Sequence, residues 1–150
     1  MSKHSEIAEK LFYEGYNCAQ AVFAAFADEY GMDRAQALRI SSSFGGGMGG
    51  MREVCGAVSG MLMAAGLIFG YDAADDPAAK TAHYARVREL ADAFRAKNGS
   101  IVCRELLSGA NIAVKTEPSE RTPAYYKKRP CPALVAMAAE ILDGYIAEHS

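Results

Sequence analysis

Apolar residues recur three or four positions apart along most of the chain, which is the spacing of one face of an α-helix. No segment shows the sustained alternation of apolar and polar residues that marks a half-buried strand. The pattern predicts helices over residues 2–14, 18–30, 34–44, 55–69, 77–98, 101–108 and 131–147. The sequence therefore predicts an all-α fold of six or seven helices.

Residues that begin and end helices support several of these boundaries. Asn17 is a good N-cap, Pro77 suits the first turn of the long helix, and Ser100 can cap a short one. Gly99 provides a stop for the long helix. Residues 109–130 are polar and contain prolines, so we expect them to form a loop.

The periodic positions also identify the side chains that we expect to face the core. They are Ile7, Ala8 and Leu11 in the first helix, Ala37, Leu38 and Ile40 in the third, and Tyr84, Val87, Leu90, Ala91 and Phe94 in the long helix. At 150 residues the chain can bury one core and is short for two. We therefore expect a single helical domain over residues 1–150.

Charge and hydropathy narrow the function classes. The formal net charge of −2 gives no general attraction to nucleic acid or to anionic lipid, so no nucleic-acid partner is expected. Residues 54–71 form an uncharged run about as long as a short transmembrane span. Glycines interrupt this run, and we expect a buried helix there instead of membrane insertion. Residues 1–17 lack the apolar core of a signal peptide, so a cytoplasmic location is expected.

The chain has four cysteines, and each falls at or near the start of a predicted helix: Cys18, Cys55, Cys103 and Cys131. At a helix start, free N–H groups and the helix dipole stabilise a thiolate and so lower the pKa of the thiol. Basic residues nearby in sequence would add to this effect: Arg52 near Cys55, Arg104 beside Cys103, and Lys127, Lys128 and Arg129 before Cys131. The pattern favours reactive or metal-ligating thiols over the alternative that each cysteine is a small buried hydrophobe.

A glycine-rich segment, FGGGMGGMREVCGAVSG over residues 44–60, leads into and includes Cys55. Glycine adopts positive φ readily and lets another backbone come close. Gly56 and Gly60 would share one face of the following helix and leave room for a neighbouring helix. We hypothesise that the segment holds Cys55 where other helix starts meet, within reach of a second thiol. The alternative is a flexible connector followed by a tightly packed helix.

These motifs resemble a known family. A lone cysteine in YNCAQAV, a Cys55-Gly56-Ala57 motif with Gly60, and two further lone cysteines are similar to the C_GCAxxG_C_C family of redox-active proteins. The resemblance runs from residue 16 to residue 131. The family label writes glycine before the central cysteine, whereas this chain has Cys55 before Gly56.

The resemblance assigns the four family cysteines to Cys18, Cys55, Cys103 and Cys131, of which we take Cys55 as the central member. It implies redox activity with an unidentified redox partner. It also implies a functional link to a transporter, because members of the family are often encoded near transporter genes.

Three functions are compatible with four such cysteines. The first is thiol–disulfide exchange, which needs two sulfurs close enough to bond. The second is a metal site for electron transfer, with Cys18, Cys55, Cys103 and Cys131 as ligands. Zinc ligands usually come in closely spaced pairs, and these four are widely separated, so an iron–sulfur cluster is favoured over zinc. The third is a non-catalytic helical binding or assembly module whose thiols only pack the core.

Other polar residues give weaker signals. His4 and His149 lie near the chain ends, where we expect solvated side chains, and His83 is expected to pack rather than to bind a metal. Glu53 could move a proton near the central thiol, although a surface carboxylate is the simpler interpretation. Residues 125–129 mix tyrosines with basic side chains, and we interpret them as a solvated loop rather than an RNA- or phosphate-binding segment.

Overall fold

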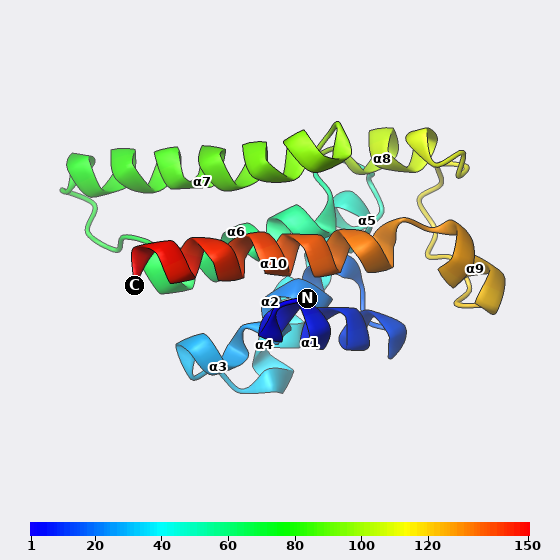
Figure 1. The fold of residues 1–150 in the computed structure, drawn as a ribbon, viewed down its shortest axis with the longest axis horizontal. Helices are drawn as coiled ribbons and strands as arrows, with labels where there is room; N and C mark the ends of the chain where they lie inside the picture. Colours follow the sequence, from blue (N-terminus) through cyan, green and yellow to red (C-terminus); the bar gives the residue numbers. More distant parts are fainter.

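The computed structural model describes all 150 residues, and it consists of α-helices with no sheet (Figure 1). The helices of seven or more residues are α1 (Lys3–Tyr13), α2 (Cys18–Ala25), α4 (Arg34–Ser41), α6 (Gly56–Phe69), α7 (Pro77–Asn98), α8 (Cys103–Gly109) and α10 (Cys131–His149). The shorter ones are α3 (Ala27–Tyr30), the 3-10 helix η1 (Ser42–Phe44), α5 (Gly45–Met48) and α9 (Pro123–Lys128). The predicted all-α fold is confirmed.

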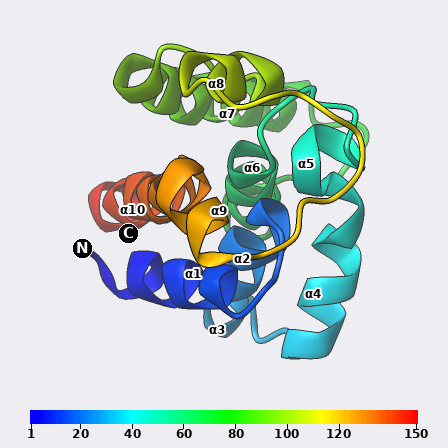
Figure 2. The same cartoon turned by 90° about the vertical axis from the view of Figure 1, so that its right-hand side faces the viewer.

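Helices α2 and α6 form the middle of the bundle. Figure 2 shows them side by side, with α7 and α8 above, α1 and α10 to the left, and α4 to the right. A cluster of 24 buried residues fills the space between these helices. Its largest fully buried side chains include Phe12, Phe23, Phe26, Met61 and Phe94. The two central helices each begin with or directly after a cysteine, so the core fixes the positions of both thiols.

Two glycines of α6 allow it to lie directly against α2. A Cβ added to Gly60 would come 2.7 Å from the carbonyl oxygen of Ala19, and one added to Gly56 would come 3.0 Å from the amide nitrogen of the same residue. The shared glycine face expected from the sequence is therefore confirmed, and α2 is the helix that it contacts. The structure has no helix both long enough and apolar enough to cross a membrane.

Local capping signals placed most helix ends correctly. Asn17 caps α2 in a reciprocal arrangement with Gln20, in which each side chain accepts a hydrogen bond from the other residue's backbone. Pro77 lies in the first turn of α7, and Gly99 ends that helix in the left-handed conformation. The predicted helix over residues 18–30 is instead interrupted at Phe26, whose ring is fully buried and stacks on the ring of His4.

Two predicted boundaries were wrong. Ser100 does not cap α8: its hydroxyl accepts a hydrogen bond from the amide of Val102, and the helix begins only at Cys103. Residues 100–102 cannot be helical because Val102 pairs with Val54 in an isolated antiparallel bridge. The predicted loop over residues 109–130 contains α9, which begins at Pro123 and is capped by the side chain of Thr122.

Some residues expected in the core lie at the surface. Tyr84 is 50% exposed, whereas its neighbour His83 is buried. Successive residues of a helix are about 100° apart, so the buried stripe of α7 follows His83, Leu90 and Phe94 and leaves Tyr84 at its edge. Ile7 and Ile40 are also exposed, because their helices lie at the periphery and bury only one narrow face.

Candidate functional site

All four cysteines begin helices, as the sequence predicts. Cys18, Cys103 and Cys131 are the first residues of α2, α8 and α10, and Cys55 is the N-cap of α6. These four helix starts surround one cavity of about 340 Å³, and all four cysteines line it. Cys55 and Cys103 are buried, whereas Cys18 and Cys131 remain partly exposed. The fold thus brings together four thiols that are far apart in the sequence.

The glycine segment turns the chain sharply back toward this cavity. Gly46 and Gly47 both have positive φ, and their carbonyl oxygens accept hydrogen bonds from the amides of Arg52 and Glu53, at 3.0 and 2.9 Å. A Cβ on Gly47 would lie 2.7 Å from the amide nitrogen of Glu53, so a side chain does not fit there. The segment is therefore a compact turn packed on itself, and not a flexible connector.

An isolated β-bridge fixes the two buried cysteines relative to each other. Residues Val54 and Val102 form the bridge. On either side of it, the amide of Cys55 donates to the carbonyl of Ile101 at 2.7 Å, and the amide of Cys103 donates to the carbonyl of Glu53 at 2.6 Å. This contact could not be predicted from the sequence, because a single bridge has no alternating pattern of side chains.

The start of α6 also approaches the start of α2 very closely. A Cβ on Gly56 would lie 3.1 Å from the Cβ of Cys18. Any side chain at this position would push the two helix starts apart. Gly56 thus places the Cys55 backbone next to that of Cys18.

The thiols of Cys18 and Cys131 line the same cavity and affect each other's ionisation. The hydrogen bond from Cys18 lowers the pKa of Cys131 to about 7, and the charges of Arg129, Arg121 and Arg52 act in the same direction against the effect of burial. The same hydrogen bond, followed by burial, raises the pKa of Cys18 well above its usual value. Of the two thiols, Cys131 is therefore the one that ionises first as the pH rises.

The pKa of Cys55 is shifted in the opposite direction to that of Cys131. Burial raises the pKa of its thiol to about 12, although hydrogen bonds from the amides of Ala57 and Val58 act in the opposite direction. The expectation that helix starts acidify the thiols is thus wrong for Cys55 and for Cys18. The helix-start amides do favour the thiolate of Cys55, but removal from water outweighs them.

The cavity carries positive charge. Its lining includes three arginines, Arg52, Arg121 and Arg129, and contains no aspartate, glutamate or lysine. The sequence assigned Arg52 to Cys55, but its guanidinium donates instead to the sulfur of Cys103, at 3.6 Å. Arg104, expected beside Cys103, points away and pairs with Glu53 at the surface.

Arg121 was missed by sequence analysis because it lies ten residues before the nearest cysteine in the chain. It reaches the site by packing over the ring of Phe12, 4.2 Å from the ring centroid, and over that of Tyr125. Residues 125–129, expected as a solvated loop, are largely part of α9, and both Tyr125 and Arg129 line the cavity.

The amino-acid sequence matches one known protein family. A sequence model of the family described as "Putative redox-active protein (C_GCAxxG_C_C)" matches residues 16–145. The chain belongs to this family. Comparisons with curated proteins and with solved structures gave no match. In this C_GCAxxG_C_C protein, the four cysteines that line the cavity all lie within the matched residues.

The thiols of this C_GCAxxG_C_C protein are spaced more widely than those of a zinc site. No three of their sulfurs lie within 4.8 Å of one another. A zinc ion with Zn–S bonds of about 2.3 Å holds its sulfurs about 3.8 Å apart in a tetrahedron. Zinc binding would therefore require the cysteine side chains to rotate or the helix starts to move.

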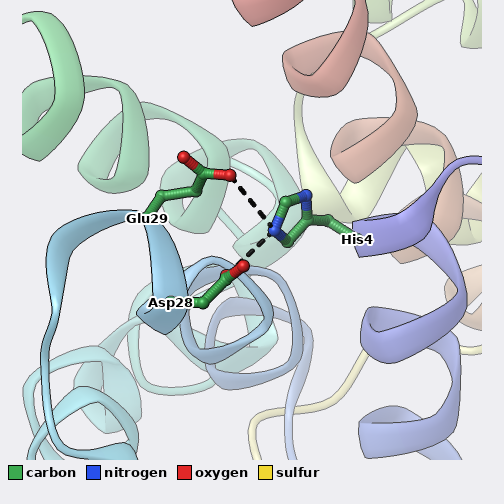
Figure 3. Close-up of side chains that lie close together, drawn as sticks. All are labelled: His4, Asp28 and Glu29. Atoms are coloured by element: carbon green, nitrogen blue, oxygen red, sulfur yellow. Dashed lines mark hydrogen bonds and ion pairs between the residues drawn. The ribbon is translucent and has the colours of Figure 1, made fainter.

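The side chains of His4, Asp28 and Glu29 form a separate cluster that could hold a metal ion (Figure 3). His4 was expected to be solvated, but it is only 3% exposed. Its ring nitrogens lie 2.6 Å from Asp143 in α10 and 2.9 Å from Asp28 in α3, and Lys3 also pairs with Asp28. In the C_GCAxxG_C_C protein this cluster joins α1, α3 and α10 through its own ion pairs.

Proposed function

We propose that this protein carries out thiol–disulfide exchange, with Cys131 as the nucleophile and Cys18 as the resolving thiol. The observation that carries the proposal is that Cys18 and Cys131 line one cavity and interact there, which lowers the pKa of Cys131 to about 7. Both thiols retain partial exposure on the cavity, so a small disulfide can reach them. The thiolate is the attacking form, and a thiol whose pKa lies near the ambient pH is the most effective nucleophile.

The reaction proceeds in two displacements. The Cys131 thiolate attacks one sulfur of a disulfide RSSR, forming a Cys131–SR bond and releasing RS⁻. Cys18 then loses its proton to a leaving thiolate and attacks the Cys131 sulfur, which forms the Cys18–Cys131 disulfide and releases the second RS⁻. Two protein thiols are oxidised and one disulfide is reduced to two RSH. A reduced redox partner would return the pair to thiols by the reverse steps.

This assignment gives Cys131 the central role that the sequence suggested for Cys55. The thiol of Cys55 has a pKa of about 12 and is almost entirely protonated near pH 7. We assign Cys55 and Cys103, which are buried on the same cavity, to a secondary role as thiols that can exchange with the Cys18–Cys131 disulfide once it has formed.

The pH dependence of the reaction tests the assignment. The rate at which Cys131 reacts with a small neutral disulfide should rise with pH and reach half its maximum near pH 7, because only the thiolate attacks. Cys18→Ala removes the hydrogen-bond donor, so the midpoint should move upward by about one unit or more. Mass spectrometry of the modified peptide at a series of pH values gives both midpoints.

The surface variant Arg95→Gln is the matched control, because Arg95 pairs with Asp92 on α7 outside the cavity and should leave the midpoint unchanged. A midpoint near 9 in the unmodified protein, or one that does not respond to Cys18→Ala, would contradict the assignment.

An iron–sulfur protein is the second candidate. Its supporting observation is that four thiols and three arginines surround one cavity, since a cluster held by four thiolates is anionic and arginines nearby would balance its charge. The four sulfurs around the cavity are farther apart than the ligands of a zinc ion. An iron–sulfur cluster is larger than a single ion and holds its cysteine ligands farther apart.

Iron and sulfide analysis with an absorption spectrum, on protein purified without oxygen, distinguishes the two candidates. Under the thiol-exchange proposal the protein should be colourless and contain less than about 0.1 iron per chain. Iron near a stoichiometric amount, with a broad visible band, would assign the four cysteines to a cluster. Absence of iron together with ordinary acidity of all four thiols would leave a non-catalytic helical module.

A further inference from the structure

We propose that the cavity selects a small disulfide that carries negative charge, so that the substrate class of this protein is an anionic low-molecular-weight disulfide. The inference rests on the proposed function, because it concerns the molecule that Cys131 attacks. Its evidence is independent of the thiol pair: it comes from the charges, hydrogen bonds and size of the cavity.

The charged side chains that line the cavity are all positive. Three arginines line it and no carboxylate does, although the chain as a whole has a formal net charge of −2. None of the three arginines has an aspartate or glutamate within ion-pairing distance; the arginines that pair with carboxylates are Arg34, Arg95 and Arg104, which lie elsewhere. Positive charge at this site is therefore not balanced by acidic side chains.

Neutral groups hold the three guanidinium groups in place. Arg52 donates to the carbonyl of Lys115 at 2.7 Å and to the sulfur of Cys103. Arg121 donates to the carbonyls of Phe12 and Tyr16, at 2.9 and 3.0 Å. Carbonyl and thiol acceptors orient these arginines without neutralising them.

Arg129 completes the set. It donates to the hydroxyl of Ser119 at 2.7 Å and stacks over the ring of Tyr125, 5.0 Å from the ring centroid. Like the contacts of the other two arginines, these orient the guanidinium without cancelling its charge.

Arg52 is the most constrained of the three. It is 8% exposed, and its backbone adopts a positive φ of 60°, which is costly for a residue with a side chain. A buried arginine without a carboxylate is itself costly. Both costs persist where the charge has a function: Arg52 favours the Cys131 thiolate, and a carboxylate on the substrate would give the guanidinium a stronger acceptor.

The position of the charge relative to the reactive sulfur fits this role. Arg52, Arg121 and Arg129 come from three separate segments, and all three line the same cavity as Cys131. An anionic group bound among them would hold the substrate's disulfide beside the attacking thiolate. The cavity volume of about 340 Å³ is at the small end of the range for small-molecule sites, which favours a small disulfide over a folded protein loop.

A series of three disulfides of similar length tests the inference: cystamine (cationic), bis(2-hydroxyethyl) disulfide (neutral) and 3,3′-dithiodipropionate (anionic). Each rate of Cys131 modification is divided by the rate of the same disulfide with free 2-mercaptoethanol, which removes intrinsic reactivity. At low salt the normalised rate should be at least tenfold higher for the anionic than for the cationic compound, and the ratio should fall as salt is added.

Arg129→Gln should reduce this ratio several-fold, and Arg95→Gln, which removes a surface arginine of α7, should leave it unchanged. Equal normalised rates for all three compounds, or an Arg129→Gln ratio equal to that of the unmodified protein, would overturn the charge selectivity and leave thiol exchange in place. Failure of Cys131 to react with any of the three would overturn the proposed function itself.

Discussion

Cys131→Ser is expected to lower the rate at which the protein reacts with a small neutral disulfide at pH 7 by about 100-fold or more. The reason is the difference in pKa between the cavity thiols. With a pKa of about 7, roughly half of the Cys131 thiols are ionised at neutral pH, whereas at a pKa of about 12 only about one Cys55 thiol in 100,000 is. Stopped-flow measurement of disulfide consumption gives the rate.

Cys18→Ser should have a different effect, because the sulfur of Cys18 is needed only in the second displacement. The mixed disulfide on Cys131 should form and then persist, so intact-mass spectrometry should show one added RS group. The unmodified protein should instead lose two hydrogens as the Cys18–Cys131 disulfide forms.

Cys103→Ser serves as the matched cysteine substitution in the same cavity and should still yield the Cys18–Cys131 disulfide. If Cys131→Ser reacts as fast as the unmodified protein, then Cys131 is not the nucleophile.

Gly60→Ala is expected to lower the free energy of unfolding by about 2 kcal/mol, because a methyl group at this position has no space. Its Cβ would lie 2.7 Å from the Ala19 carbonyl oxygen and 3.1 Å from the Cβ of Val22, both in α2. A backbone atom cannot rotate away, so α2 and α6 must separate and leave part of the core underpacked. The melting temperature should fall by about 4–8 °C, as measured by calorimetry or circular dichroism.

Gly66→Ala in the same helix is the matched control. A Cβ at Gly66 meets nothing within 4 Å, so the substitution adds helix propensity without a clash. It should raise the free energy of unfolding by up to about 1 kcal/mol. Equal effects of the two substitutions would show that the close contact between α2 and α6 does not limit stability.

The helices and the position of the four cysteines at or near their starts could be predicted from the amino-acid sequence alone. Both depend on local interactions: the Asn17 cap contacts Gln20 only three residues away, Pro77 restricts its own φ, and Gly99 adopts the left-handed conformation that ends α7. The glycine spacing in α6 also indicated a close helix contact, because residues four apart share a helix face. The family assignment followed from the same cysteine motifs.

The chemical differences between the cysteines were decided only by the tertiary structure. All four occupy equivalent local positions at helix starts, yet Cys131 is acidified and Cys55 is not, because burial and neighbouring charges depend on which helices pack together. The charge of Arg121 also lowers the pKa of Cys131, although no local sequence pattern links the two residues.

The burial of His4 could not be predicted from local sequence either. Because His4 lies near the chain end it was expected to be solvated, but it is buried because α3 and α10 bring Asp28 and Asp143 to its ring. Helix caps depend on residues a few positions apart. The burial and the neighbouring charges that set the pKa of a thiol depend on segments that are far from it in the sequence.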